Sequence, residues 1–164
     1  MREDACMSEP AGRDRLVTVT AEGDVAQPPQ QVFSIVGDPL TYSSWCGGVL
    51  DVEAAPAAEH EPPAWFIRVG ARVGLIKMST RLRMELVVDE PPTHLAFQRR
   101  ELNQPGHSRA SLRVDVRATA TGSTVVTTIE LGASKLPPGA EALLRREVRK
   151  SSKRIESLLS QPLR

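Results

Sequence analysis

The sequence predicts an α+β fold in which an antiparallel sheet of about seven strands curves around one long C-terminal helix, with two short helices after the first strand. Apolar and polar residues alternate in several short runs between residues 16 and 131, which is the pattern of strands with one buried face. Turn sequences rich in proline and glycine separate these runs. Only residues 137–159 are long and periodic enough for a helix of several turns, so the sheet must curl around that helix to cover its apolar face.

The C-terminal helix is expected from Pro137 to Leu159. At about 100° per residue, its apolar side chains share one face and its six central basic side chains share the other. Ser151 interrupts the middle of the apolar stripe, with Ser152 at its margin. A small polar residue here leaves room for a ligand cavity between helix and sheet. Alternatively, the helix approaches a strand closely and the Ser151 hydroxyl bonds back to a carbonyl of the preceding turn.

The N-terminal residues 1–14 are polar and without periodicity, so we expect a mobile tail before a single domain at residues 15–164. Residues 16–25 alternate as a half-buried strand. The prolines at positions 28 and 29 then open a short helix, because a proline at the first helical position loses no hydrogen bond. Gly37 ends this helix.

A second short helix is expected after Asp38-Pro39. The Asp38 carboxylate can cap free amides, and the proline suits the first helical position. This helix carries Tyr42 and Trp45 and ends at Gly47-Gly48. The two short helices therefore form a bent pair.

The remaining strands follow from alternation between turn sequences, of which Asp89-Glu90-Pro91-Pro92 and Thr121-Gly122-Ser123 are the clearest. Hairpin-linked alternation implies an antiparallel sheet with one wet face. Strands are expected at residues 49–54, 65–73, 78–88, 95–101, 110–118 and 125–131.

Composition limits the functional classes. The chain has 164 residues, 40% of them hydrophobic, and a net charge of +1, which suits one domain and excludes a strongly charged protein. Charge is unevenly distributed, because residues 135–164 hold eight Lys or Arg against three Asp or Glu. No stretch has the apolar length of a membrane span, and the first residues lack the apolar core of a secretion signal, so a cytoplasmic location is expected.

Metal, cofactor and nucleophile motifs are not evident in the sequence. Cys6 and Cys46 form neither a disulfide framework nor a CxxC pair, so both are expected as free thiols. The three histidines lack the spacing of a helical zinc pair. We therefore expect no metal site and no cofactor.

The order of elements and the residues between Val17 and Val49 resemble the START-like helix-grip superfamily, also called SRPBCC. The likeness is greatest to polyketide cyclase/dehydrase-type members and to those similar to the G-type subunit of carbon monoxide dehydrogenase, and it covers roughly residues 15 to 160. The Pro91-Pro92 turn and the closing helix match as well. The residues that carry the likeness are Pro28, Val32, Phe33, Val36, Asp38, Pro39, Tyr42 and Trp45.

The resemblance implies a seven-stranded sheet curved around the C-terminal helix, with a cavity between them whose mouth the short helices guard. Members of the superfamily bind hydrophobic or amphipathic molecules such as lipids, sterols and polyketides; some cyclise them and others carry them. In such a fold, the cavity interpretation of Ser151 is favoured over close packing.

Arg99 and Glu101 are candidate polar groups of this cavity. They share the strand phase of Leu95 and Phe97, so if those two side chains point inward, the charged pair does too. An inward pair could orient a ligand carboxylate or carbonyl, and Glu101 is the one candidate for acid–base catalysis. Alternatively, the strand leaves the core near Arg99 and both side chains are solvated, which suits charged residues better.

Further candidate ligand-binding residues are aromatic, apolar or small polar side chains on the inner faces. Tyr42 and Trp45 either line the cavity entrance or anchor the second short helix to the sheet, and packing is expected to come first. For the others, ordinary core packing is the alternative. The set comprises Tyr42, Trp45, Thr80, Met84, Phe97, Arg99, Thr127 and Ser151.

The function that these features favour is binding or carriage of a hydrophobic small molecule, without catalysis. The alternatives are a polyketide cyclase or dehydratase, and an interaction module that uses the basic face of the C-terminal helix. Nucleic acid is disfavoured as a partner, because no aromatic residues for base stacking are interleaved with the basic ones. A homodimer is left open by the sequence.

Overall fold

The computed structural model describes residues 15–73, 75–100, 109–132 and 138–161. The strands are β1 (Leu16–Val25), β2 (Val49–Ala55), β3 (Ala64–Val73), β4 (Ile76–Glu90), β5 (His94–Arg99), β6 (Ala110–Thr119) and β7 (Gly122–Gly132). The helices are α1 (Pro29–Val36), the 3-10 helix η1 (Pro39–Thr41), α2 (Tyr42–Trp45), α3 (Ala140–Arg149) and α4 (Ser151–Leu159). The predicted element order is confirmed, and Glu101 and the tail at residues 1–14 lie outside the described residues.

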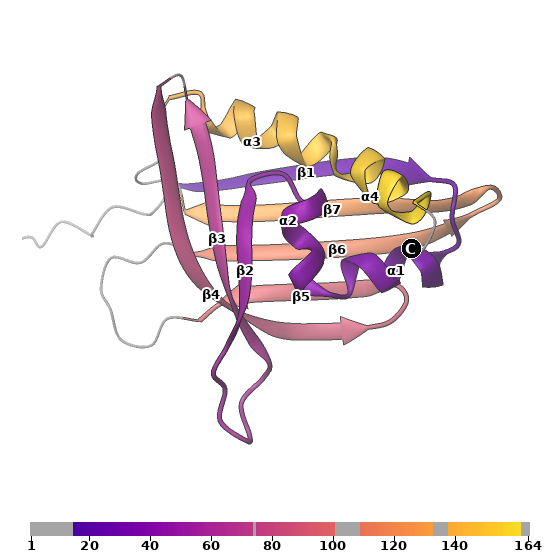
Figure 1. Ribbon diagram of the computed structural model, residues 1–164, viewed down its shortest axis with the longest axis horizontal. Helices are drawn as coiled ribbons and strands as arrows, with labels where there is room; N and C mark the ends of the chain where they lie inside the picture. The colour runs from indigo at the N-terminus through magenta and orange to yellow at the C-terminus, as the bar shows by residue number, and fades with distance from the viewer. Residues whose placement is uncertain (1–14, 74, 101–108, 133–137, 162–164) are drawn as a thin grey trace, which may run out of the picture.

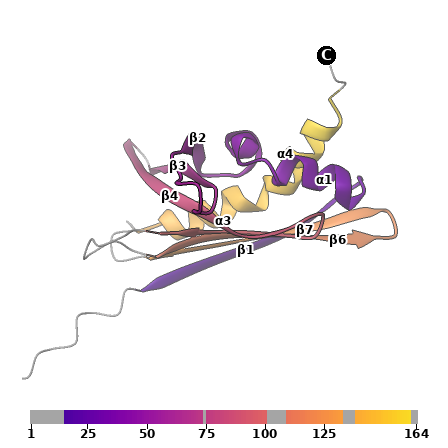
Figure 2. The ribbon, with the colours of Figure 1, turned by 90° about the horizontal axis from the view of Figure 1, so that it is seen from below.

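All seven strands form one antiparallel sheet in the order β1-β7-β6-β5-β4-β3-β2 (Figure 1). The sheet is strongly curved, and the helices lie on its concave side (Figure 2). The register sets the faces, because Val19 of β1 pairs with Ile129 of β7, and Ile129 pairs with Leu112 of β6. The predicted curved sheet and its helix cover are therefore confirmed.

The short helices begin and end where the sequence indicates. Pro29 occupies the first turn of α1, and Gly37 follows its last residue. The Asp38 carboxylate accepts a hydrogen bond from the Leu40 amide at 3.0 Å, which caps η1 as predicted. Gly48 has a φ of +88°, a backbone conformation that favours glycine, so the chain can turn there from α2 into β2.

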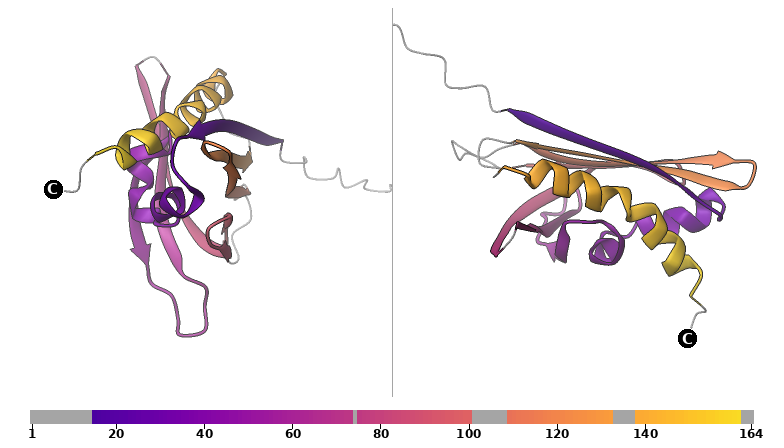
Figure 3. Two further views of the ribbon diagram at one scale, coloured as in Figure 1. Left: turned by 90° about the vertical axis from the view of Figure 1, so that its right-hand side faces the viewer. Right: turned by 90° about the horizontal axis from the view of Figure 1, so that it is seen from above.

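The C-terminal helix differs from the single rod that its periodicity predicts. Within the described residues it begins at Ala140, and it is bent at Lys150 into α3 and α4 (Figure 3). The Lys150 amide bonds to the Glu147 carbonyl at 3.1 Å, a tighter i to i−3 pattern. Two serines follow this point, and serine is a poorer helix former than the alanine, leucine and arginine on either side.

The core consists of two clusters beneath the two halves of this helix. The larger cluster lies under α1, α2 and α4, and includes Tyr42, Trp45, Phe97 and Ile155. The smaller one joins Val148 of α3 to the inner face of β1 through Val17, Val19 and Ala21. Ile129 of β7 is only partly buried and contacts both clusters.

Candidate ligand-binding site

The helix bend brings Ser151 into the interior next to β1. Ser151 is 2% exposed, and its Oγ has no hydrogen-bond partner among the described residues. The neighbouring Ser152 packs against Gly23, where an added Cβ would lie 2.0 Å from the Ser152 Oγ. The predicted close approach therefore occurs one residue later than expected, and no bond from the Ser151 hydroxyl to the preceding turn is formed.

A small cavity lies beside Ser151. Its volume is about 10 Å³, and its lining includes Thr127 of β7 together with Ala21 and Val125. Thr127 is itself 2% exposed. The structure thus brings together two of the predicted site residues, Thr127 and Ser151. This space is the size of one water molecule, and far below the roughly 300–1,000 Å³ of ligand pockets.

The predicted aromatic residues fill the larger core cluster. Tyr42 makes edge-to-face contacts with Trp45 and Phe97, at centroid distances of 4.8 and 5.8 Å. The Tyr42 hydroxyl donates to the Val36 carbonyl at 2.7 Å, and the Trp45 Nε1–H donates to the Thr41 hydroxyl at 3.1 Å. These polar groups hold α1, η1 and α2 together, so Tyr42 and Trp45 act here as the packing anchors that the sequence also allowed.

Burial changes the acidity of two groups in this cluster. It raises the pKa of Tyr42 well above 10, with smaller contributions from Cys46 and Asp38. It also raises the pKa of Cys46 to about 12, against an opposing effect of Arg154. Both groups are therefore neutral at physiological pH, and the Cys46 thiol is not an activated nucleophile.

Arg99 and Met84 share the concave face, as the strand phase predicts. Arg99 pairs with Met84 across β5 and β4, and Met84 is 4% exposed. Arg99 is partly buried, with a buried Nε, so it is not fully solvated as the alternative expects. Thr80 lies further along β4, opposite Val69 of β3, and its side chain is exposed. Thr80 therefore lies at the rim of the concave face and not within the core.

The residues that sequence reasoning missed as a site lie beneath α3. This helix rests mainly on β1 and β3, near the two ends of the curved sheet. The inner-face residues Ile129 and Leu131 of the intervening strand β7 remain partly exposed, although Val17 and Val19 beside them on β1 are buried. Alternation predicts that they point inward but not that they are incompletely covered. We call Ile129, Leu131, Val69 and Leu144 the α3 surface.

Glu85 is the one carboxylate that is buried among the side chains described. It is 4% exposed and belongs to the convex face, where its register partners are Ala64 and Gln98. Its carboxylate forms ion pairs with Arg83 and with Arg100, the latter at 3.4 Å. This group is paired structurally and faces away from the helices.

A curved antiparallel sheet that wraps a bent C-terminal helix, with short helices at one end and an incompletely covered inner face, defines a START-like helix-grip protein. The family model described as "Polyketide cyclase / dehydrase and lipid transport" matches residues 17–159. The chain therefore belongs to this family, as its resemblance at the sequence level indicated.

Solved structures share the fold at low sequence identity. TTHA0849 from Thermus thermophilus has a TM-score of 0.66 at 19% identity, over 87% of this chain and 97% of that chain. CV1439 from Chromobacterium violaceum has a TM-score of 0.62 at 14% identity, over 88% and 99%. The di-domain ARO/CYC BexL of the BE-7585A biosynthetic pathway has a TM-score of 0.58 at 15% identity, over 92% and 52%. No curated protein matches the sequence. In the part of the chain that the structure describes, no helix could cross a bilayer.

Proposed function

We propose that this protein binds and carries a hydrophobic or amphipathic small molecule, of lipid or polyketide type, between α3 and the concave face of the sheet. The observation that supports this proposal is the α3 surface, where Ile129 and Leu131 remain partly exposed beneath a helix that rests near the two ends of the sheet. Apolar area left accessible on a concave face favours an apolar ligand, because its burial releases about 25 cal/mol per Å². The family description, which names lipid transport, agrees with this class of ligand.

Binding of such a ligand requires α3 to move. The space at Ser151 is about 10 Å³, whereas ligand pockets measure roughly 300–1,000 Å³. α4 is anchored by its contacts with α1, α2 and β1, and its Ile155 is fully buried. The bend at Lys150 separates this anchored half from α3, so α3 can tilt away from β7 while α4 stays in place.

Carriage is favoured over catalysis by the charges that face the ligand. Acid–base catalysis needs a proton donor or acceptor within about 3 Å of the reacting atom. The buried carboxylate of Glu85 faces the other side of the sheet and is already paired with arginines. Arg99 lies on the concave face, where a guanidinium orients a ligand carboxylate or carbonyl without transferring a proton.

Fluorescence titration with 1-anilinonaphthalene-8-sulfonate, followed by displacement with stearic acid or naringenin, tests this proposal. The wild-type chain is expected to bind the probe at one site and release it to the competitor. Ile129→Trp fills the α3 surface and is expected to weaken probe binding at least tenfold, roughly the effect of one or two kcal/mol of lost contact.

The matched control is Thr128→Trp, which adds the same side chain to the next residue of β7, on the convex face. Thr128 pairs with Thr20 and Arg113, and its hydroxyl lies 3.3 Å from that of Thr20. Unchanged binding in this variant locates the site on the concave side. Equal effects of the two substitutions, or no binding by the wild type, would refute the proposal.

A further inference from the structure

A row of basic side chains lies on the solvent-facing side of the C-terminal helices. Arg146, Arg149 and Lys153 are exposed, and their spacing of three and four residues aligns them on one face across the bend. We call these three residues the cationic stripe. Among the described side chains, none of the three has an ion-pair partner.

The two nearest acids of these helices are already engaged by other bases. Glu141 pairs with Arg145 at 3.1 Å and with Arg15 at 3.4 Å. Glu147 bonds to Lys150 and Arg154, each at 2.8 Å across the bend, and these bonds lower its pKa. The charge of the cationic stripe is therefore not neutralised by its neighbours.

An open hollow of about 470 Å³ lies along this face of α3. Its lining includes Arg145, Arg146 and Arg149, and the small residues Gly139 and Ala142 leave its floor accessible. Guanidinium groups bind phosphate through paired N–H donors, and three of them around one hollow suit a phosphate-bearing group.

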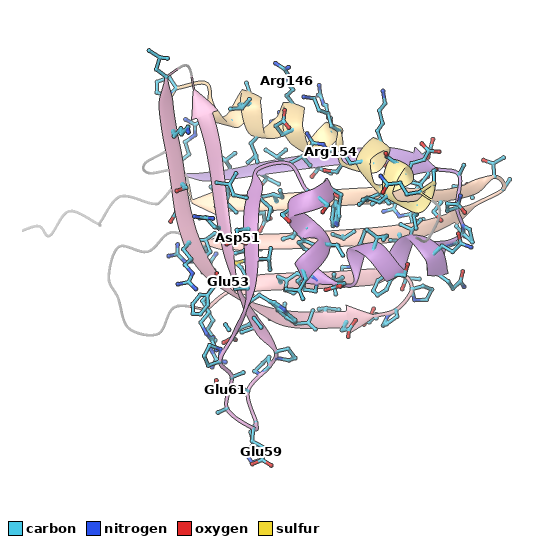
Figure 4. All side chains as sticks on the ribbon, in the orientation of Figure 1. Asp51, Glu53, Glu59, Glu61, Arg146 and Arg154 are labelled. Carbon is cyan, nitrogen blue, oxygen red and sulfur yellow. The ribbon has the colours of Figure 1, made fainter. Side chains whose placement is uncertain are left out.

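A fully exposed leucine lies on the same side of the molecule. Leu75, at the tip between β3 and β4, is 99% exposed, and Lys77 beside it is also exposed. The β3–β4 tip and α3 lie along the same edge, the upper one in Figure 1, and Figure 3 shows both from two further directions. Arg146 is labelled on that edge in Figure 4, opposite the end that carries Glu59 and Glu61. One flat surface can therefore contact the tip and α3 together.

We propose that this edge docks on a membrane surface that contains anionic phospholipids. The cationic stripe contacts the lipid phosphates, and Leu75 enters the interfacial region beside them. Anionic surfaces attract each nearby Lys or Arg, and an inserted apolar side chain adds a contribution that salt does not screen. The combination of unneutralised basic residues with an exposed leucine is what separates this edge from an ordinary solvated helix face.

Two other occupants fit the observations less well. Nucleic acid is disfavoured because neither residues 70–79 nor residues 140–159 contain an aromatic residue for base stacking. A second copy of this chain would have to offer its acidic end, but there Asp51, Glu53 and Glu61 are paired with Arg68, Arg81 and Arg83. A membrane supplies both the phosphates and the apolar phase.

Docking is a property of the outer surface, so it goes beyond ligand carriage and does not depend on it. Its consequence for a carrier is direct, because α3 is also the helix that covers the α3 surface. Contact with a bilayer would place that helix at the source of hydrophobic ligands.

Vesicle co-sedimentation of the full chain tests the proposal. The probes are vesicles of phosphatidylcholine alone and of phosphatidylcholine with phosphatidylglycerol, at low and high salt. We expect binding to the anionic vesicles alone, weakened by salt. Arg146→Gln/Arg149→Gln/Lys153→Gln should lower the partition coefficient about 100-fold at low salt, since each basic residue contributes about fivefold. Leu75→Ser should lower it about tenfold at either salt concentration.

The matched control removes three exposed arginines from the convex face. Arg109→Gln/Arg113→Gln/Arg117→Gln changes the net charge equally, and all three side chains are exposed. Leu40→Ser, at a leucine that is 57% exposed on η1, is the control for Leu75. Near wild-type binding by both controls supports docking at the proposed edge. Equal losses in test and control variants would overturn it, and so would binding of an RNA oligonucleotide or self-association in place of vesicle binding. Probe binding by Ile129→Trp is measured separately, so failure of either proposal is distinguishable.

Discussion

The contact between Gly23 and Ser152 holds the C-terminal helix against the edge of the sheet, and it can be tested by a double-mutant cycle. Gly23→Ala would place a Cβ 2.0 Å from the Ser152 Oγ and 2.4 Å from the Ser152 Cβ. A change of rotamer can move the Oγ, but the Cβ is fixed to the helix backbone. α4 must therefore move by about 1 Å to restore van der Waals distance.

The expected cost follows from this displacement. Overpacking of a well-packed interior costs typically about 1–3 kcal/mol, and we expect about 2 kcal/mol for Gly23→Ala. In a chain of this size, such a loss lowers Tm by roughly 4–8 °C. Ser152→Gly alone should cost about 0.5 kcal/mol through helix propensity. In the double variant the nearest remaining atom is the Ser152 Cα position at 3.9 Å, so alanine fits and most of the loss should be recovered.

Urea unfolding of the four proteins, monitored by tryptophan fluorescence, gives the coupling free energy. A coupling of about 1.5 kcal/mol or more is expected, whereas distant sites add within about 0.5 kcal/mol. Gly139→Ala is the control, because an added Cβ there meets nothing within 4 Å and its cost comes from a φ of +86°. Ser152→Gly should not rescue that variant. Strict additivity of Gly23→Ala and Ser152→Gly would refute the close approach of α4 to β1.

Three further predictions concern polar groups of the same helix and its neighbours. Ser151→Ala removes a buried hydroxyl that has no partner in the described residues, and should raise the free energy of unfolding by about 1 kcal/mol in urea titrations; a loss would contradict this. Glu147→Gln should destabilise the fold at neutral pH. The lowered pKa of Glu147 contributes stability above its unfolded value of 4.5, and this contribution is lost as the pH falls through the folded pKa, so wild type and variant should converge in acid; a pH-independent difference would argue against the ion pairs. The Cys46 thiol, with a pKa of about 12, should react with Ellman's reagent at mildly alkaline pH only as fast as the protein unfolds; rapid reaction of the native Cys6→Ser protein would show that Cys46 is accessible.

The fold could be predicted almost completely because each element is marked locally. Alternation marks the strands, Pro29 and Asp38 mark the starts of the short helices, and Gly48 ends the second one. An apolar face on every strand and a single amphipathic helix leave few arrangements other than a curled sheet. The break at Lys150 was not predicted, since periodicity continues through it. It depends on the contact of Ser152 with Gly23, residues more than a hundred positions apart.

The candidate site was predicted less well, for a physical reason. Strand phase correctly places Met84, Phe97 and Arg99 on the concave face. It cannot tell whether a side chain there is covered, and the extent of cover separates Thr127 in the core from Thr80 at the rim.

The sequence by itself determined the order of elements, the inward face of each strand and the basic outer face of the last helix, because all three depend on residue types at short spacing. Only the tertiary structure decided how closely the helix meets the sheet. That distance depends on side chains from distant segments meeting in space. As a result, the structure leaves about 10 Å³ at Ser151 and places the accessible apolar surface beneath α3, at Ile129 and Leu131.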